Sequence, residues 1–290
     1  MSSRVAAALS AVLFWSTNAL AAKYGLVNLT VPELLTIQFS AASIMLIGLY
    51  FVRQRHLSFF SERPPVTHML IGLVGLAGTI VLQYIAFGLG NILEANVVAY
   101  SWPLLVAVWA ALVLRTPIGY TGIVLALLGF YGVSMIMDKK GTMDLLQGTN
   151  MGEIVAFASA ACMAFYTIAS SRIEITEKLL IPVTFISALG CFIVTHIQGV
   201  TWPHIHHWWV AAYIGVGPMA AGYFLWTYAM SGDGAKILAP IGYTTPLLST
   251  VLLLASGEDY TQRTLYGIAL VLSSSIGVLF LQHVYARLRG

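Results

Sequence analysis

The side chains that could bind a ligand are polar and aromatic groups set inside long apolar segments. A polar side chain in such a segment is costly unless it faces protein or water. The candidate binding residues are Trp15, Asn18, Gln38, Gln83, Tyr100, Trp102, Tyr166, Tyr223, Trp226 and Tyr243. Amides, phenols and indoles together favour recognition of a small molecule by hydrogen bonds and ring stacking.

The spacing of these residues places several of them on shared helix faces. Asn18 follows Trp15 by three residues, and Trp226 follows Tyr223 by three. Residues three or four apart lie on the same side of an α-helix. Each pair therefore presents its two side chains to one neighbouring surface.

Three prolines interrupt the apolar segments that carry these side chains, namely Pro103, Pro240 and Pro246. A proline has no N–H group and so removes a hydrogen bond from a helix. Breaks within membrane-spanning helices expose backbone groups and mark binding sites in transport proteins. We expect helix breaks at the site near these three positions.

The chemistry of this set fits an amino acid zwitterion. A carboxylate would accept hydrogen bonds from amides and phenols, and an ammonium group would lie over indole or phenol faces. A phosphorylated ligand would favour arginine or lysine in the site. Lys23, Arg115, Arg172 and Lys236 all lie at the ends of apolar segments, which disfavours such a ligand.

The composition identifies the solvent of the chain as lipid. Only 9% of the 290 residues are charged and 59% are hydrophobic, with a net charge of +3. A soluble domain typically has about 25% charged residues. The composition therefore excludes a soluble enzyme, a disordered chain and a nucleic-acid-binding protein. No catalytic constellation and no metal or cofactor motif is found, so we expect neither an enzyme nor a cofactor.

Ten apolar segments are long enough to cross a bilayer, which needs about 20 residues each. They cover 4–22, 32–53, 68–90, 94–113, 118–137, 150–171, 180–198, 207–230, 235–256 and 263–286. The predicted fold class is an all-α integral membrane protein of ten transmembrane helices.

Lysine and arginine define the predicted orientation. Ten of the 14 lie on the side that would carry both termini, including Arg53, Arg55 and Arg63. Cytoplasmic loops are enriched in these residues, so both termini should be cytoplasmic. An alternative interpretation takes residues 1–21 as a cleaved signal peptide.

The two halves of the sequence repeat each other. A shift of 143 residues places Tyr100 on Tyr243 and Pro103 on Pro246. We expect a first repeat over 1–140 and a second over 148–290, in one integrated unit. Five helices per repeat is an odd number, so the second repeat is inverted, with a cavity between the two.

Four segments carry a resemblance to a known family, namely Phe14 to Thr17, Glu94 to Pro103, Ala164 to Thr167 and Gly242 to Pro246. In these segments and along its whole length the chain resembles EamA-type members of the drug/metabolite transporter superfamily, in particular bacterial exporters of aromatic amino acids. The resemblance implies a ten-helix exporter in the bacterial inner membrane. It would move small molecules from the cytoplasm by alternating access.

Two questions of function stay open. Aromatic and other large neutral amino acids, with methionine and threonine as further possibilities, would leave by facilitative transport. The alternative is a proton-coupled exporter of drugs or quaternary cations, in which Glu94 would couple transport to protons. The expected partners are the small-molecule substrate and the lipid bilayer, and the expected oligomeric state is a monomer.

Overall fold

The described part of the chain is built from helices. The computed structural model describes residues 2–54, 64–113, 119–137, 151–170, 177–200, 202–230, 241–242 and 244–289, and within these ranges no strand occurs. The α-helices are α1 (Ser2–Gly25), α2 (Val31–Gln54), α3 (Val66–Leu70), α4 (Gly78–Leu89), α5 (Ile92–Ala99), α6 (Trp102–Val113), α7 (Gly119–Met137), α8 (Met151–Ser170), α9 (Glu177–Ile197), α10 (Trp208–Ile214), α11 (Gly222–Met230), α13 (Thr244–Ala255) and α14 (Gln262–Arg289).

The described elements also include two π-helical stretches and a 3₁₀ turn before α10. The stretch η2 (Ile71–Ala77) joins α3 to α4, and η4 (Gly215–Ala221) joins α10 to α11, so each lies inside one long helical segment. The 3₁₀ turn η3 (Ile205–His207) precedes α10. π-Helical turns are rare and occur frequently at functional sites.

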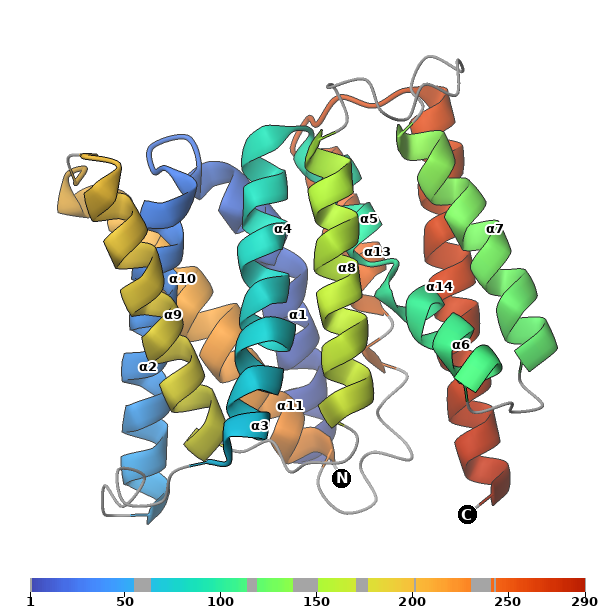
Figure 1. Ribbon diagram of the computed structural model, residues 1–290, viewed down its shortest axis with the longest axis horizontal. Helices are drawn as coiled ribbons and strands as arrows, with labels where there is room; N and C mark the ends of the chain where they lie inside the picture. Colours follow the sequence, from blue (N-terminus) through green and yellow to red (C-terminus); the bar gives the residue numbers. More distant parts are fainter. Residues whose placement is uncertain are drawn as a thin grey trace.

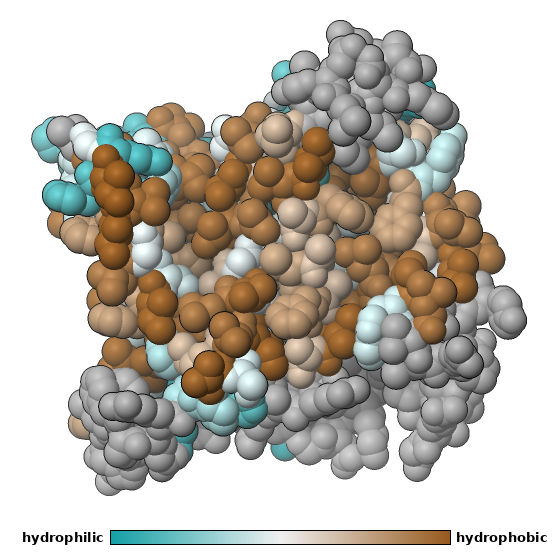
Figure 2. All heavy atoms as spheres, in the orientation of Figure 1, coloured by the Kyte–Doolittle hydropathy of each residue, from teal (hydrophilic) through white to brown (hydrophobic). Residues whose placement is uncertain are grey.

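The lengths and composition of the helices agree with a membrane protein. Six stretches are long and apolar enough to cross a bilayer: Ser3–Gly25, Val31–Val52, Val66–Leu89, Ile92–Trp109, Met151–Ala169 and Lys178–Ile197. Figure 2 shows hydrophobic residues across the middle of one face, with hydrophilic residues gathered toward its edges. Each of the ten predicted segments overlaps a described helix, but the count of ten crossings stays a prediction.

The helices form two outer pairs around a central group (Figure 1). The helix α2 packs along α9 on one side, and α7 packs along α14 on the other. Between them, α4 packs against α8 and α1 packs against α11. The backbones of α7 and α14 approach closely at Gly132 and Gly267, where an added Cβ would lie 2.7 Å from the other residue's carbonyl oxygen. Small residues permit such close packing in membranes.

The helical segment that carries Pro103 is broken, but the break lies before the proline and not at it. The helix α5 ends before Tyr100, whose ψ angle is 4°, and α6 begins at Trp102. Pro103 is the second residue of α6, in the first turn, where a missing N–H leaves no helix bond unmade. Pro246 likewise lies in the first turn of α13, and Pro240 lies outside the described residues.

Candidate functional site

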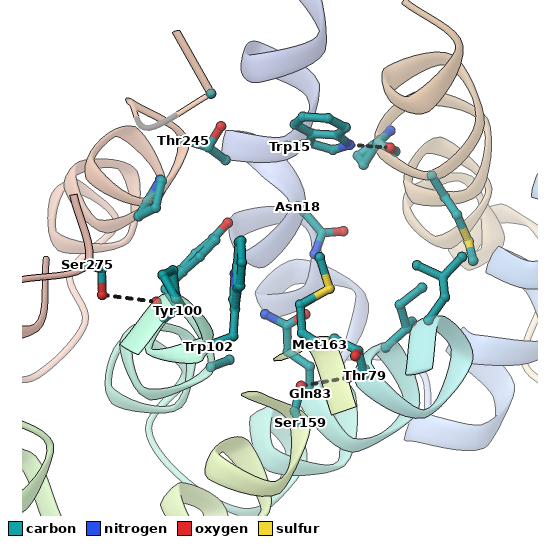
Figure 3. A pocket seen from close by; sticks show the side chains of 18 of the residues that line it. Trp15, Asn18, Thr79, Gln83, Tyr100, Trp102, Ser159, Met163, Thr245 and Ser275 are labelled. Carbon is teal, nitrogen blue, oxygen red and sulfur yellow. Dashed lines mark hydrogen bonds between the residues drawn. The ribbon is translucent and has the colours of Figure 1, made fainter. Parts of the chain in front are cut away.

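A cavity of about 420 Å³ lies between the central helices (Figure 3). Its wall is formed by residues of α1, α2, η2, α4, α5, α6, α8, η4, α11, α13 and α14, together with Tyr100 and Gly242. Helices distant in sequence thus meet around one space, which is the arrangement the predicted site requires.

Most of the predicted site residues line this cavity. The lining includes Trp15, Asn18, Gln38, Gln83, Tyr100, Trp102, Pro103, Tyr223, Trp226 and Pro246. Tyr166 is buried on α8 but does not line the cavity. It packs against η2, where a Cβ added to Gly75 would lie 2.7 Å from the Tyr166 Cβ. Tyr243 and Pro240 lie outside the described residues.

Three aromatic rings form a fixed wall between α1 and α11. The ring centroids of Trp15 and Tyr223 are 5.5 Å apart at an interplanar angle of 69°, and those of Trp15 and Trp226 are 5.3 Å apart at 56°. The Nε1 of Trp15 donates to the carbonyl oxygen of Pro218 in η4 at 2.9 Å. Since this N–H is used, Trp15 offers a substrate its ring surface rather than a hydrogen bond.

The three amide side chains have different bonding states. The Oδ1 of Asn18 accepts from the Tyr84 hydroxyl at 2.9 Å. Gln38 is 2% exposed, and its Nε2 faces the Met219 sulfur at 3.7 Å. Gln83 is half-buried, and Figure 3 shows it directed toward the same space as Asn18. Two of the three amides, Asn18 and Gln83, are thus open enough to meet a ligand.

Several lining residues were not predicted from the sequence, namely Thr79, Tyr84, Ser159, Met163, Met219, Thr245 and Ser275. The Thr79 hydroxyl donates to the Gly75 carbonyl at 2.6 Å, and the Ser159 hydroxyl donates to the Thr79 carbonyl at 2.8 Å. Ser159 and Met163 are four residues apart on α8, so helical spacing alone could have paired them. Nothing in the sequence distinguishes them from packing residues.

The described part of the cavity wall is uncharged. No residue of the described lining is aspartate, glutamate, lysine, arginine or histidine. Glu94, the predicted coupling residue, is 2% exposed and does not line the cavity. Its Oε1 accepts from the Thr264 hydroxyl at 3.1 Å, and its backbone N–H donates to the Asn91 side chain at 3.1 Å. Glu94 therefore joins α5 to α14 near the helix ends.

Polar contacts join the helices at the end of the molecule opposite the two termini (Figure 1). Lys23 and Glu258 form an ion pair at 2.8 Å, and the Asn91 amide donates to the Asp259 carbonyl at 2.8 Å. Deeper in the molecule, the buried Asn96 amide donates to the Ser249 hydroxyl at 3.0 Å, between α5 and α13.

Comparison with known proteins identifies similar sequences and a similar fold. The sequence model of the EamA-like transporter family matches residues 3–138 and again residues 150–280. The aromatic amino acid exporter YddG of Ancylobacter novellus is 28% identical over 255 residues, which are 86% of each chain. A crystal structure titled only as that of a protein superposes with a TM-score of 0.68 at 25% identity, and the match covers 97% of this chain and 98% of that one.

Proposed function

The chain belongs to the EamA-like transporter family, and from this premise we propose that it exports neutral amino acids, aromatic and other large ones first, through the central cavity. The absence of charged side chains from the described part of the cavity wall is the observation that carries the proposal. A phosphorylated substrate would need arginine or lysine there, and a lipophilic cation would be favoured by a carboxylate. A zwitterion has no net charge and can be held by amides, hydroxyls and rings.

The aromatic wall supports the preference for large side chains. Trp15, Tyr223 and Trp226 form one ring cluster, and Tyr100 and Trp102 lie at the break between α5 and α6. Ring faces attract both an ammonium group and an aromatic side chain. The related protein of Ancylobacter novellus is named for export of aromatic amino acids, which agrees with this chemistry.

Two inverted five-helix halves would give the chain its alternating access. The family model matches the chain twice, which supports repeats over 1–140 and 148–290. The two π-helical stretches also support the repeat: η2 and η4 are both seven residues long and are offset by 144 positions. This offset is within one residue of the shift of 143 that aligns Tyr100 with Tyr243. Inverted repeats are typical of transporters that rock around a midplane site.

The proposed orientation places both termini in the cytoplasm of a bacterium, with the chain in the inner membrane as a monomer. The excess of lysine and arginine on the side of the termini supports it. At the opposite end, Lys23 and Glu258 form an ion pair that joins α1 to the segment after α13. We therefore assign the conformation to the state that receives substrate from the cytoplasm.

Efflux from proteoliposomes tests the function. Purified protein is reconstituted, and the vesicles are preloaded with labelled tryptophan, phenylalanine, methionine, threonine, lysine or a quaternary amine, with no ion gradient. We expect the neutral amino acids to leave faster than they leave preloaded liposomes that contain no protein. Lysine and the quaternary amine should show no such increase. Release of the amine alone, or release only under a pH gradient, would contradict facilitative amino acid export and favour a proton-coupled drug exporter.

A further inference from the structure

A single hydrogen bond at the cavity wall fixes which way one amide faces. Tyr84 on α4 is 1% exposed, and its ring packs against Phe87 with centroids 5.5 Å apart. Its hydroxyl donates to the Oδ1 of Asn18 on α1 at 2.9 Å. A buried phenol has one hydrogen to donate and loses stability if that hydrogen is unpaired. Tyr84 therefore binds one lone pair of the Asn18 oxygen and holds that oxygen toward α4.

This bond turns the oxygen of Asn18 toward Tyr84. An asparagine amide has one oxygen with two lone pairs and one NH₂ group with two hydrogens. With one lone pair of Oδ1 bound by Tyr84, the Nδ2 hydrogens are the larger part of the bonding capacity of the half-buried Asn18 side chain that remains for a ligand in the cavity. Two N–H donors on one nitrogen suit a carboxylate oxygen and oppose an ammonium group.

The facing wall supplies acceptors. The hydroxyl hydrogen of Thr79 is used by the Gly75 carbonyl at 2.6 Å, so the Thr79 hydroxyl oxygen can only accept a further hydrogen bond. Gln83, four residues along the same segment, lines the same cavity, and its amide can turn its oxygen toward an ammonium group. Figure 3 shows Asn18 and Gln83 directed toward one central space. The carboxylate of one amino acid can thus meet the donors of Asn18 while its ammonium group meets the acceptors of Thr79 and Gln83.

We propose that Tyr84 is a positioning residue, which holds Asn18 as a carboxylate donor and thereby makes the cavity select amino acids over amines that lack a carboxylate. The inference rests on the proposed function and adds the orientation of the substrate, with the carboxylate toward α1 and the ammonium group toward Thr79 and Gln83. Without the Tyr84 hydroxyl, Asn18 is free to turn its oxygen into the cavity. The oxygen would then repel the carboxylate and attract an amine.

The test compares three ligands that share an indole ring. Tryptophan has both charged groups, tryptamine lacks the carboxylate, and indole-3-propionate lacks the ammonium group. Their half-maximal concentrations for inhibition of labelled phenylalanine efflux are measured in proteoliposomes. For Tyr84→Phe we expect the value for tryptophan and indole-3-propionate to rise about tenfold, while that for tryptamine stays level or falls. Asn18→Asp, which replaces the donors by an acceptor, should shift the three ligands in the same directions and further.

Tyr213→Phe is the matched control. The Tyr213 hydroxyl also bonds a side chain of α1, Thr17, at 2.7 Å, but neither residue lines the cavity. In this variant, the ratios between the half-maximal concentrations of the three ligands should equal those of the wild type. The inference would be overturned if Tyr84→Phe left these ratios unchanged or raised the half-maximal concentrations of all three ligands equally. Either result would leave the proposal of amino acid export intact. A wild type that releases no neutral amino acid would instead overturn the proposed function and the inference with it.

Discussion

The Nζ of Lys23 lies 2.8 Å from the Oε1 of Glu258 and also donates to the carbonyl and hydroxyl oxygens of Ser256, each at 3.0 Å. Lys23 belongs to the last turns of α1, whereas Ser256 and Glu258 follow α13. One ammonium group therefore ties together two helices that are far apart in sequence. These contacts must break before α1 and α13 can separate at this end.

Charge reversal should show how strongly this ion pair holds the closed end. Lys23→Glu and Glu258→Lys should each lower the melting temperature in detergent, because each places like charges together. The double variant should recover most of the loss. Pairs of this exposure contribute about 1 kcal/mol, so a shift of a few degrees is expected. A double variant that is as unstable as the sum of the single variants would show that the two charges do not interact.

The glycine at the start of η4 should be intolerant of any side chain. A Cβ at Gly215 would overlap the carbonyl oxygen of Gln38 on α2, so Gly215→Ala must push two packed helices apart. We expect a loss of about 1–3 kcal/mol, as for other overpacked sites, and a lower melting temperature. Gly190→Ala on α9 is the control, since nothing lies within 4 Å of its Cβ, and it should be neutral or stabilising. Equal melting temperatures for Gly215→Ala and Gly190→Ala would refute the tight packing at η4.

Trp102 should determine the preference for bulky substrates. It lines the cavity directly after the break at Tyr100, and Trp102→Ala removes a large stacking surface. Efflux of tryptophan should fall about tenfold, while that of threonine, which has little to stack, should change by less than about twofold. Initial rates for both substrates from the same vesicles provide the comparison. An equal loss for the two would assign Trp102 a structural role instead.

Glu94 should not couple transport to protons. It lies outside the cavity and accepts a hydrogen bond from Thr264, an interaction that the amide oxygen of Glu94→Gln can replace. We expect the variant to export phenylalanine at a rate within about twofold of the wild type. An imposed pH gradient should alter the rate of neither protein. A gradient that accelerates the wild type but not Glu94→Gln would establish proton antiport.

The sequence predicted some of the polar residues that line the cavity. Asn18, Gln38 and Gln83 lie in apolar segments, and the cost of a polar group in lipid directs such side chains toward protein or water. The same reasoning does not separate a cavity from a packed core. Tyr166 was predicted as a site residue because it lies inside an apolar segment, but it fills the space beside Gly75. An aromatic ring satisfies either environment.

Features that depend on distant partners could not be predicted. Tyr84 is typical of a core aromatic residue, and only the fold shows that its hydroxyl reaches Asn18, 66 positions away in the chain. Pro103 predicted a break at its own position, yet the chain leaves the helix at Tyr100 and Ser101, because a proline is well accommodated in the first turn of the next helix. The π-helical stretches leave no comparable mark in composition.

The two π-helical stretches also determine the rotational register of the helices that follow them. A helix turns by about 100° per residue, so loss of one residue from η2 would rotate the whole of α4 relative to α3 by that angle. Thr79, Gln83 and Tyr84 would then move away from Asn18 and the rest of the cavity together. The same holds for η4 with respect to Tyr223 and Trp226. The composition of the binding surface therefore depends on residue count in two short stretches as much as on the side chains that form it.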